Sequence, residues 1–600
     1  MLDRLALLVR LAPALPRLAA HRPQGRATVA DRLEERARSH PDRPFVLFED
    51  RRLDYGDLNA AANRVAHWAR GLGLGRGDVV ALLMENRPEY VATWAGLAKL
   101  GVTTALINHN LTGQALGHSL ATAGARHLVL GSECAATWAT AADALEAPIE
   151  VWCARDPSEV DPATVPGAGD LEAALAGQST MNPDPALRAL LRSGDLLFYI
   201  YTSGTTGLPK AARFSHMRFF GAGDIYSWAL GLGPRDVYYC ALPLYHTAGG
   251  VVVVSTVLAA GATLALRRRF SARAFWDDVR KFDATCFQYI GEFCRYLMNQ
   301  PERDNDRDHR VRAISGNGLR PEIWEAFQKR FGIERVLEFY GATEGNAGLM
   351  NFENKVGSVG RFPFKFLTNG RLIRYDVDSD AHTRDERGLC IECGPEEVGE
   401  FVGRIPPRDD TATGRFEGYT DPEATEKKIL RDVFEPGDAW FRSGDLLRQD
   451  ADGFFYFVDR IGDTFRWKGE NVSTQEVATA LSDWPDFEMV NVYGVEVPGA
   501  DGRAGMAAVL LRPGAELRGA ELHAFVHERL PRYAAPLFLR VLPEVEVTGT
   551  LKLRKVNLQR EGFDLDRVDD ALYLRDDAAG AYVPLTPGIA AEIRGGVRKL

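Results

Sequence analysis

The sequence predicts an α/β protein of at least two domains, in which mostly parallel β-sheets are covered by helices. Short apolar runs alternate with longer amphipathic segments along most of the chain, and such alternation produces parallel sheets with helices on their faces. With 600 residues, the chain is also longer than one hydrophobic core usually organises. No internal repeat or low-complexity tract interrupts the pattern.

Local signals place the individual elements. Thr28 and Asp31 form a capping pair for a helix that continues through Ala37. The elements predicted after it are, in order, two short strands around a polar turn over 43–53, a helix over 55–70, a strand over 79–84, a helix over 89–100 and, far downstream, a turn at 450–453 (DADG) followed by a strand over 454–458.

One segment invites a different interpretation. Residues 247–266 carry no charge, and three arginines follow them, so a hydropathy window would mark a membrane span. However, Gly249 and Gly250 lie near its start, and Gly261 is placed to end a helix before a short strand. We therefore expect a buried helix and strand of an α/β core.

Charge and cysteine content exclude several classes of protein. The formal net charge of −10 argues against nucleic acid as a partner, because binding there depends on basic surface. Seven cysteines without regular spacing argue against a disulfide framework and for a reducing compartment, which we expect to be the cytoplasm. Cys390 and Cys393 form one CxxC, but no second pair accompanies it, so a zinc site is not expected.

The N-terminal arm, 1–27, is rich in leucine and alanine, and residues 1–26 carry five arginines against one aspartate. Such a segment can make a weak peripheral contact with the anionic inner face of the cell membrane. Pro13 and Pro16 interrupt any helix there, and the segment is neither a clean signal peptide nor a span. Two interpretations stay open: a peripheral membrane contact, and a poorly ordered basic arm.

Residues 201–210 (YTSGTTGLPK) have the composition of a phosphate-binding loop. Glycines let the backbone approach a ligand closely, so that successive N–H groups cradle anionic oxygens, and the hydroxyls and lysine add donors. The apolar run 196–201 predicts the buried strand that leads into this loop. Leu208 and Pro209 follow Gly207, which is not the spacing of P-loop NTPases. The alternative is an ordinary hairpin connection.

This loop and six further motifs resemble those of the acyl-adenylate-forming superfamily, which includes acyl-CoA synthetases, luciferases and peptide-synthetase adenylation domains. The resemblance extends over nearly everything from about Thr28 onward, and the wording FRWKGENVST is closest to the branch called fatty acid transport proteins or very-long-chain acyl-CoA synthetases. The other motifs are ALPLYHTAGG (241–250), an aromatic and histidine motif; SGNGLR (315–320), an adenine turn; EFYGATEGN (338–346), an adenine and magnesium motif; SGD (443–445), a ribose motif; DRIGDTFRWKGENVST (459–474), a hinge and thiolation loop; and the stretch 530–552, which ends in the catalytic lysine.

The resemblance implies a large adenylate-forming domain followed by a small, mobile α+β domain. Gly462, followed by Asp463, stands where the superfamily usually has Asp or Lys at the hinge. Because glycine permits large backbone rotations, we expect the hinge to be retained. The domains implied are the arm over 1–27, the AMP-binding (adenylation) domain over 28–458, and the mobile domain over 459–600 with its hinge near 459–463.

The resemblance also implies ATP, Mg²⁺ and CoA as cofactor and co-substrates. Attack of a carboxylate on the α-phosphorus of ATP brings two anions together, so the site must supply positive charge. Glu344 is implied as the Mg²⁺ ligand with Thr343 beside it on phosphate, and Lys552 as the bridge between carboxylate and α-phosphate. The residues expected to bind ATP or AMP are Tyr201, Thr202, Ser203, Gly204, Thr205, Thr206, Gly207, Lys210, Gly316, Asn317, Tyr340, Gly341, Thr343, Asp445 and Arg460.

Three positions carry alternatives or a second role. The chain has TGTLK at 548–552 where the superfamily has TxxGK, which leaves Lys555 as a second candidate for the catalytic lysine. His246 either gates and orients the acyl substrate or is a structural histidine. Gly469 lies nine residues after Arg460, which matches the position that lines the pantetheine tunnel. The residues implied in thiolation are Trp467, Lys468 and Gly469.

Together these features predict an ATP-dependent acyl-CoA ligase that forms an acyl-AMP and pyrophosphate, and then transfers the acyl group to CoA. A long or very long fatty acid is the expected substrate, and a steroid, bile-acid or other bulky carboxylic acid is the enzymatic alternative. A different hypothesis is a lipid-uptake protein that traps fatty acids at a membrane with degenerate catalysis. Degenerate catalysis would be indicated by the loss of Glu344, Asp445 or Lys552, and all three are present.

Overall fold

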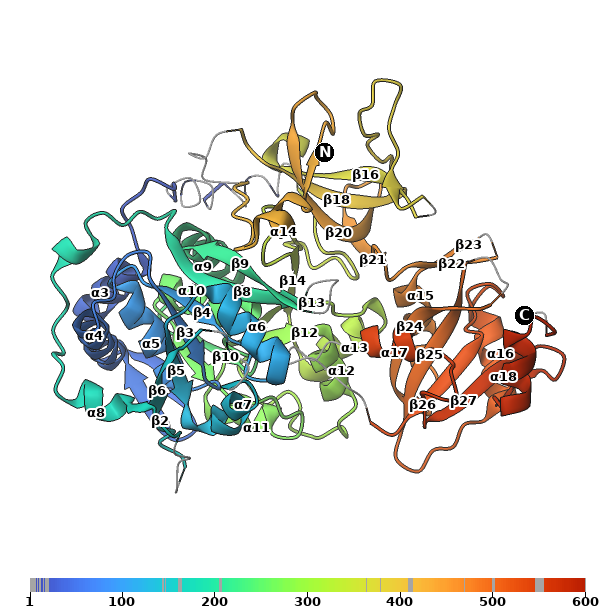
Figure 1. Cartoon of the computed structure of the whole chain (residues 1–600), viewed down its shortest axis with the longest axis horizontal. Helices are drawn as coiled ribbons and strands as arrows, with labels where there is room; N and C mark the ends of the chain where they lie inside the picture. Colours follow the sequence, from blue (N-terminus) through green and yellow to red (C-terminus); the bar gives the residue numbers. More distant parts are fainter. Residues whose placement is uncertain are drawn as a thin grey trace. The chain divides into compact units, whose positions relative to one another are not determined.

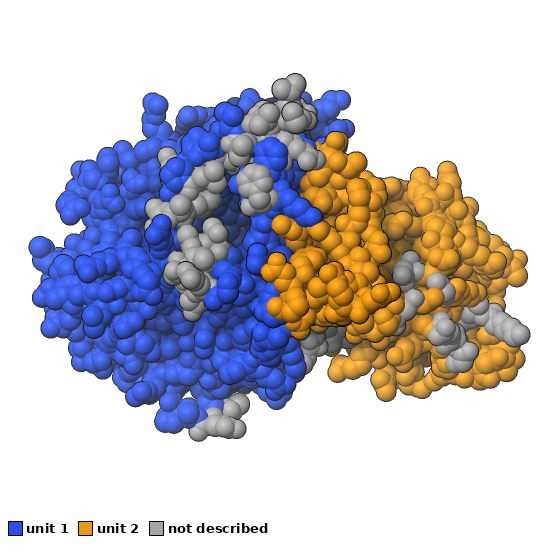
Figure 2. All heavy atoms as spheres, turned by 90° about the horizontal axis from the view of Figure 1, so that it is seen from above, with its two compact units in different colours: residues 1–370, 403–431, 437–441 blue, residues 371–402, 432–436, 442–600 orange. Residues whose placement is uncertain are grey.

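The described residues fall into two compact units in the computed structural model (Figure 2). Unit 1 comprises 1–370, 403–431 and 437–441, and unit 2 comprises 371–402, 432–436 and 442–600. The predicted domain boundaries after residues 27 and 458 stay predictions. The structure describes residues 7, 9, 12–13, 16, 21–142, 145, 147–159, 165–203, 208–362, 364–377, 379–407, 414–468, 470–498, 502–544 and 555–598.

Unit 1 contains an eight-stranded sheet with the order β15-β14-β13-β12-β10-β11-β1-β2 (Figure 1). Its neighbours pair in parallel from β1 through β14, and only the outermost strands, β2 and β15, pair antiparallel. The strands are β1 (Pro44–Phe48), β2 (Arg51–Asp54), β10 (Val237–Cys240), β11 (Thr263–Leu266), β12 (Cys286–Ile290), β13 (Ala313–Asn317), β14 (Arg335–Gly341) and β15 (Gly348–Met350).

A second, seven-stranded sheet of unit 1 has the order β7-β6-β5-β3-β4-β8-β9 and is parallel except for the edge pair β8-β9. Its inner strands β3, β4 and β5 are buried at every residue except Val79 and His127, as expected of a parallel sheet with both faces covered. The strands are β3 (Val79–Leu83), β4 (Thr103–Leu106), β5 (His127–Gly131), β6 (Glu150–Ala154), β7 (Gly169–Asp170), β8 (Leu196–Ser203) and β9 (Pro209–Ser215).

The helices of unit 1 confirm the predicted α/β class. Thr28 and Asp31 form the predicted capping box, and the helix that they start, α3, runs over Val29–Ser39. The other helices are α4 (Tyr55–Gly71), α5 (Pro88–Ala98), α6 (Gly113–Ala123), η1 (Ser132–Cys134), α7 (Ala135–Ala139), α8 (Leu171–Ala176), η3 (Pro185–Arg188), α9 (His216–Leu230), η4 (Thr247–Val253), α10 (Val254–Ala260), α11 (Phe275–Lys281), α12 (Gly291–Met298), α13 (Pro321–Phe331), η5 (Lys365–Leu367) and α14 (Pro422–Glu426).

The uncharged segment 247–266 is a buried part of this core. It forms the π-helix η4, the short helix α10 and the strand β11, and Gly261 ends α10 with a φ of 66°, as predicted. All four residues of β11 are buried between β10 and β1. No helix in the described part of the chain has both the length and the apolar character needed to cross a bilayer. Most of the N-terminal arm lies outside the described residues.

Unit 2 contains the five-stranded sheet β24-β25-β26-β27-β28, which is antiparallel except for β25 and β26. One hydrophobic cluster, from Phe465 to Ile593, joins this sheet to its helices. These elements are β22 (Phe465–Trp467), β23 (Glu470–Val472), α15 (Thr474–Ser482), β24 (Phe487–Glu496), β25 (Arg503–Leu511), α16 (Gly519–Arg529), β26 (Phe538–Leu542), α17 (Val556–Glu561), β27 (Ala571–Asp576), β28 (Ala581–Pro584) and α18 (Pro587–Arg594).

A six-stranded sheet precedes this core in the chain. In it β20 pairs with β21 across the predicted turn at 450–453, and β19 pairs with the first residues of β20. Its strands are β16 (Gly370–Asp376), β17 (Ala381–His382), β18 (Val398–Arg404), β19 (Ile429–Arg431), β20 (Ala439–Gln449) and β21 (Phe455–Arg460). All seven cysteines of the chain are free thiols, which confirms that no disulfide framework is present.

Candidate functional site

The predicted phosphate loop connects β8 and β9 at the edge of the seven-stranded sheet. Thr202 lies opposite Lys210 in the ladder, so both lie at the base of the loop. Successive side chains of a strand point to opposite faces, and the hydroxyl of Tyr201 accordingly donates to the backbone oxygen of Ser119 in α6, at 2.6 Å. Tyr201 therefore ties the strand to the core through its side chain. Gly204, Thr205, Thr206 and Gly207 lie outside the described residues, as does the side chain of Ser203.

The Glu344 carboxylate is held beside the base of this loop. The hydroxyl of Tyr419 donates to Glu344 Oε1 at 2.8 Å, and the same hydroxyl also interacts with the Thr202 side chain. Burial, together with the charge of Glu344 and the bond to it, raises the pKa of Tyr419, so the hydroxyl stays a donor. Among the described residues, no donor bonds to Glu344 Oε2. The carboxylate is thus oriented through one oxygen and keeps the other for a ligand.

Two lysines add positive charge around this carboxylate. Lys428 Nζ lies 3.9 Å from Glu344 Oε1, and Lys210 Nζ lies 6.0 Å from the centre of the Tyr419 ring. Both ammonium groups therefore lie near Glu344, which the resemblance assigns to Mg²⁺, and near the loop that it assigns to phosphate. An anion that binds here would be attracted by both positive charges.

Hydrogen bonds from Arg218 hold the backbone on both sides of Glu344. Arg218, in the first turn of α9, donates to the backbone oxygens of Thr343 at 2.7 Å and Gly345 at 2.8 Å. Burial lowers the pKa of the Arg218 guanidinium, but an arginine side chain is not deprotonated in proteins, so it remains a cation. The Thr343 hydroxyl shares a hydrogen bond of 2.8 Å with Thr247 at the start of η4. The phosphate, glutamate and histidine motifs are therefore linked by direct contacts.

The predicted adenine turn is bonded to the next strand through Glu338. The buried carboxyl of Glu338 accepts the hydroxyl of Tyr289 and the backbone N–H of Gly318, whose φ of 83° favours glycine. Burial raises the pKa of Glu338 to about 8. At Gly316, a Cβ would lie 2.3 Å from the Tyr289 carbonyl oxygen, so the turn has no room for a side chain there.

The other predicted adenine residues lie on the same two strands. Gly316 and Asn317 end β13, while Tyr340 and Gly341 end β14. Strands β13 and β14 pair in parallel, so these carboxyl ends meet at one edge of the sheet. Ligands of open α/β sheets bind outside this edge, which is where the resemblance places adenine.

His246 caps the π-helix η4. Its Nδ1 accepts the backbone N–H of Ala248 at 3.2 Å, and the side chain is half-buried. The glycines that follow let the chain fold back, because a Cβ at Gly250 would lie 2.0 Å from the carbonyl oxygen of Leu244. This bond gives His246 a structural role at Nδ1, and its role toward the substrate stays a prediction.

In unit 2, the predicted ribose motif is part of β20. Asp445 lies directly opposite Arg460 of β21, with Asp445 Oδ1 3.4 Å from Arg460 Nε. The backbone N–H of Asp445 donates to Ser443 Oγ at 3.0 Å, and that hydroxyl donates to the backbone oxygen of Phe401 at 2.6 Å. The Asp445 side chain, which is proposed to bind ribose, is therefore held by Arg460 on the neighbouring strand. Its backbone is held by Ser443 of the same motif.

A second buried acid supports this motif. Glu400, which is fully buried, accepts the backbone N–H of Gly444 at 2.9 Å, and its other oxygen lies 2.6 Å from His382 Nε2 and 3.3 Å from Arg442 Nη2. Burial alone would raise the pKa of Glu400, but the bond to His382 and the charge of Arg442 lower it overall. Glu400 thus stays ionised and fixes the part of β20 that contains Asp445.

The predicted hinge is closely bonded within unit 2. Asp459 is buried and accepts the N–H of Thr474 at 2.7 Å, and burial raises its pKa. Gly462 has a φ of 91°, which favours glycine. Lys555 Nζ lies 3.0 Å from Asp463 Oδ2 and 2.9 Å from Thr474 Oγ1. In this structure Lys555, the second candidate for the catalytic lysine, binds the hinge. Lys552 lies outside the described residues.

The predicted thiolation residues lie at a tight hairpin between β22 and β23. Trp467 is buried in the unit 2 core, whereas Lys468 is exposed with a φ of 53°, and its Nζ lies 5.8 Å from the centre of the Trp467 ring. Gly469 lies outside the described residues. Trp467 therefore anchors the hairpin, and the roles of these residues toward CoA stay predictions.

Several residues of the site were not foreseen from the sequence. Four of them belong to no short motif, because each acts across a long stretch of chain: Glu344 and Tyr419 are 75 residues apart, and Glu400 and Gly444 are 44 apart. These four are Arg218, Glu400, Tyr419 and Lys428. The fifth, Glu338, lies in the motif at 338–346, but the sequence indicated no role for its side chain.

Comparison with known proteins gives consistent matches. The family model "AMP-binding enzyme" matches residues 33–372, and "AMP-binding enzyme C-terminal domain" matches 476–552. The chain is 43% identical to long-chain fatty acid transport protein 2 of Rattus norvegicus over 92% of this chain and 88% of that protein. It is 41% identical to the medium/long-chain-fatty-acid–CoA ligase FadD6 of Mycobacterium tuberculosis over 94% of this chain and 90% of that protein.

Solved structures agree on the fold. The anthranilate CoA ligase AuaEII in complex with anthranoyl-AMP superposes with a TM-score of 0.73, at 20% identity over 89% of this chain and 97% of that one. ATP-bound MatB from Rhodopseudomonas palustris gives 0.72, at 23% identity over 89% and 99%. At such identities the likeness shows the fold and leaves the substrate to other evidence.

Proposed function

The chain belongs to the AMP-binding enzyme family, and from that premise we propose that it is an AMP-forming acyl-CoA ligase for long-chain fatty acids. The relatives' names supply the substrate class, since one is a long-chain fatty acid transport protein and another is a medium/long-chain fatty acid–CoA ligase. Both are covered along most of their length, so the proposal concerns the whole reaction: acyl-AMP and pyrophosphate first, then acyl-CoA and AMP.

The observation that carries the proposal is the oriented carboxylate of Glu344. Tyr419 and Lys428 hold Oε1, while Oε2 has no donor among the described residues, next to a predicted phosphate loop. Mg²⁺ is bound in nucleotide sites by one or two carboxylates together with phosphate oxygens, so the Glu344 carboxylate beside the predicted phosphate loop suits this ion. Bound there, the ion would neutralise phosphate charge and thereby assist the departure of pyrophosphate.

The chain's own residues would then act on ATP and the acid. Lys210 and Lys428 attract the polyphosphate, and Asp445 accepts hydrogen bonds from the ribose hydroxyls, with Glu400 as the positioning residue behind it. Lys552 would place a point charge between the two reacting anions, where charge builds up in the transition state. His246 would orient the acid.

We propose that the second half-reaction uses the opposite face of the predicted mobile domain, residues 459–600. Rotation about Gly462 would withdraw Lys552 and bring the turn at Lys468 and Gly469 to the acyl-AMP, where the absence of a side chain at 469 leaves room for the thiol of CoA. We also propose a peripheral membrane contact by the N-terminal arm, because it is rich in leucine and alanine and carries five arginines over residues 1–26. Such a contact would suit a role in fatty acid uptake.

The test is an assay of the purified full chain for AMP formation with octanoate, palmitate, lignocerate and cholate, each with and without CoA. We expect acid-dependent AMP formation that needs CoA for turnover and is greatest with palmitate or lignocerate. Preference for cholate would favour the bulky-acid alternative. Failure of all four acids to elicit AMP or pyrophosphate, in a protein that still binds palmitate, would favour the lipid-trapping hypothesis and overturn the ligase.

A further inference from the structure

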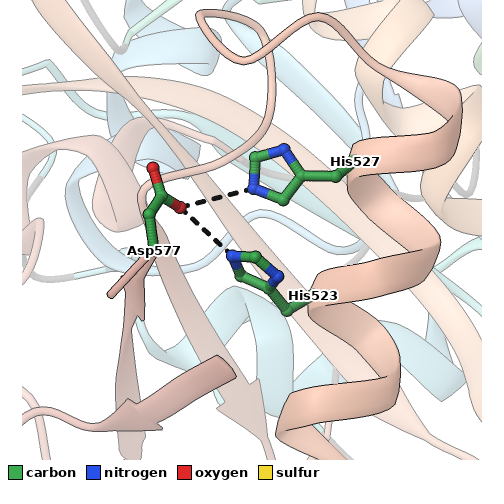
Figure 3. A group of neighbouring side chains, drawn as sticks. All are labelled: His523, His527 and Asp577. Carbon is green, nitrogen blue, oxygen red and sulfur yellow. Dashed lines mark hydrogen bonds and ion pairs between the residues drawn. The ribbon is translucent and has the colours of Figure 1, made fainter. Parts of the chain in front are cut away.

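Two histidines of the C-terminal segment project from one helix toward one carboxylate (Figure 3). His523 and His527 are four residues apart on α16, so their side chains share a face of the helix. Their Nε2 atoms lie 3.1 Å and 3.3 Å from the same oxygen of Asp577, Oδ1. Asp577 directly follows β27, in the turn that leads to β28. Neither the sequence analysis nor the proposed ligase reaction uses this group.

The spacing of these three atoms is that of metal ligands. In a tetrahedral zinc site the bonds to histidine nitrogen and carboxylate oxygen are about 2.1 Å long, which places neighbouring ligand atoms about 3.3 Å apart. The three ligand atoms lie within 4.8 Å of one another, and no other group of three such ligands occurs among the described residues. We propose that His523, His527 and Asp577 bind a divalent transition-metal cation of the Zn²⁺ class.

The scaffold of the group is rigid. Helix α16 approaches β28 so closely that a Cβ at Gly519 would lie 2.2 Å from the carbonyl oxygen of Tyr582. Arg532 donates to Asp577 Oδ2 from Nε at 2.9 Å and from Nη2 at 2.8 Å, and so orients the carboxylate with Oδ1 toward the histidines. Hydrogen-bonded second partners of this kind hold metal ligands in place.

Two arginines set the strength and the coordination of the site. Arg532 and Arg575 add two positive charges near Asp577, and Arg575 Nε lies 3.0 Å from Oδ1, so we expect modest affinity and a cation that binds mainly through the two imidazoles. Three protein ligands leave a fourth position for water. Bound there, the ion would join α16 to the β27–β28 turn and stabilise this part of unit 2.

The test is a titration of the chelator-treated full chain with ZnCl₂ by calorimetry. The comparison is between the wild type, the double variant His523→Gln/His527→Gln and Asp577→Asn. The matched control is His127→Gln, because His127 lies 3.3 Å from Glu150 and is as exposed as His523, at 14% of the side chain, but belongs to no group of three ligands among the described residues.

We expect the wild type and the control to bind one more equivalent of Zn²⁺ than the double variant, and Asp577→Asn to bind it at least tenfold more weakly. Equal stoichiometry and affinity in wild type and double variant would overturn the proposal. If the double variant does not fold, the Cu²⁺ form of the wild type decides by electron paramagnetic resonance: coupling to two imidazole nitrogens supports the site, and its absence overturns it. Neither readout depends on ligase activity.

Discussion

The hydrogen bond from Tyr419 to Glu344 gives the sharpest test of the proposed adenylation site. Tyr419→Phe removes only the hydroxyl that orients Glu344 Oε1 at 2.8 Å. Both residues are almost fully buried, with 4% of Tyr419 and 9% of Glu344 exposed, so water cannot readily replace the lost donor. The substitution therefore probes how far the orientation of this one carboxylate matters.

The size of the effect follows from the charge on the acceptor. A hydrogen bond to a charged group contributes about 1.5–3 kcal/mol. At about 1.36 kcal/mol per factor of ten, the loss of this bond corresponds to a decrease of about 10- to 150-fold in the rate of acyl-AMP formation at limiting Mg²⁺. We also expect a higher Mg²⁺ concentration for half-maximal rate, because Glu344 would no longer be held with Oε2 directed to the ion.

The assay is ATP–pyrophosphate exchange with palmitate over a titration of MgCl₂. Tyr456→Phe is the matched control, because the Tyr456 hydroxyl also donates to a carboxylate, Asp450 Oδ2 at 3.0 Å, in a hairpin without a predicted ligand. The thermal midpoint of both variants shows whether the fold persists. A Tyr419→Phe enzyme with the wild-type rate and the wild-type Mg²⁺ titration would refute the reasoning.

Three further predictions concern other parts of the reaction and the fold. Lys552→Ala should bind ATP but form acyl-AMP about 10²-fold more slowly; unchanged pyrophosphate release would remove Lys552 from the mechanism. Gly469→Leu should retain pyrophosphate exchange and lose thioester formation, since its side chain enters only the thiol path; equal loss of both steps would contradict the rotation about the hinge. Glu338 has a folded pKa of about 8 against an ordinary 4.5, so the stability that it contributes is complete below pH 4.5 and is lost as the pH rises to about 8. Glu338→Gln should flatten the decrease of the thermal midpoint over this range, and an unaltered pH profile would show that the carboxyl is not protonated in the fold.

The sequence predicted the fold well because its signals are local. The capping box at Thr28 and Asp31, the short apolar runs of the strands and the left-handed Gly261 each depend on residues a few positions apart. The parallel sheets follow from the alternation of such elements. The family was identified in the same way, since each motif is a short contiguous string.

The support of the site could not be predicted, because it depends on contacts between distant residues. Nothing in the spacing of Tyr419 indicates that its hydroxyl reaches Glu344, 75 positions earlier. Tyr201 was predicted to bind ATP or AMP from its place in the motif, and the sequence did not indicate that its hydroxyl donates to the backbone oxygen of Ser119. Its role toward the nucleotide stays a prediction. The roles of Lys552 and Gly469 stay predictions.

In both the proposed adenine turn and the proposed ribose motif, a buried carboxyl accepts the backbone N–H of a left-handed glycine. Glu338 holds Gly318 in the adenine turn, and Glu400 holds Gly444, with a φ of 78°, in the ribose motif. The two carboxyls nevertheless differ in charge. Glu338 has a tyrosine hydroxyl and backbone N–H groups as partners, so burial dominates and the carboxyl is protonated at neutral pH.

Glu400 has cationic partners and stays ionised, so its contribution to stability is present above its ordinary pKa of 4.5 and is lost as the pH falls below it. Acid therefore weakens the support that Glu400 gives the ribose motif, and a rise in pH from 4.5 to about 8 weakens the support that Glu338 gives the adenine turn. We expect both carboxyls to affect the pH dependence of nucleotide binding at the proposed site, because each acts on its motif through the backbone of a glycine.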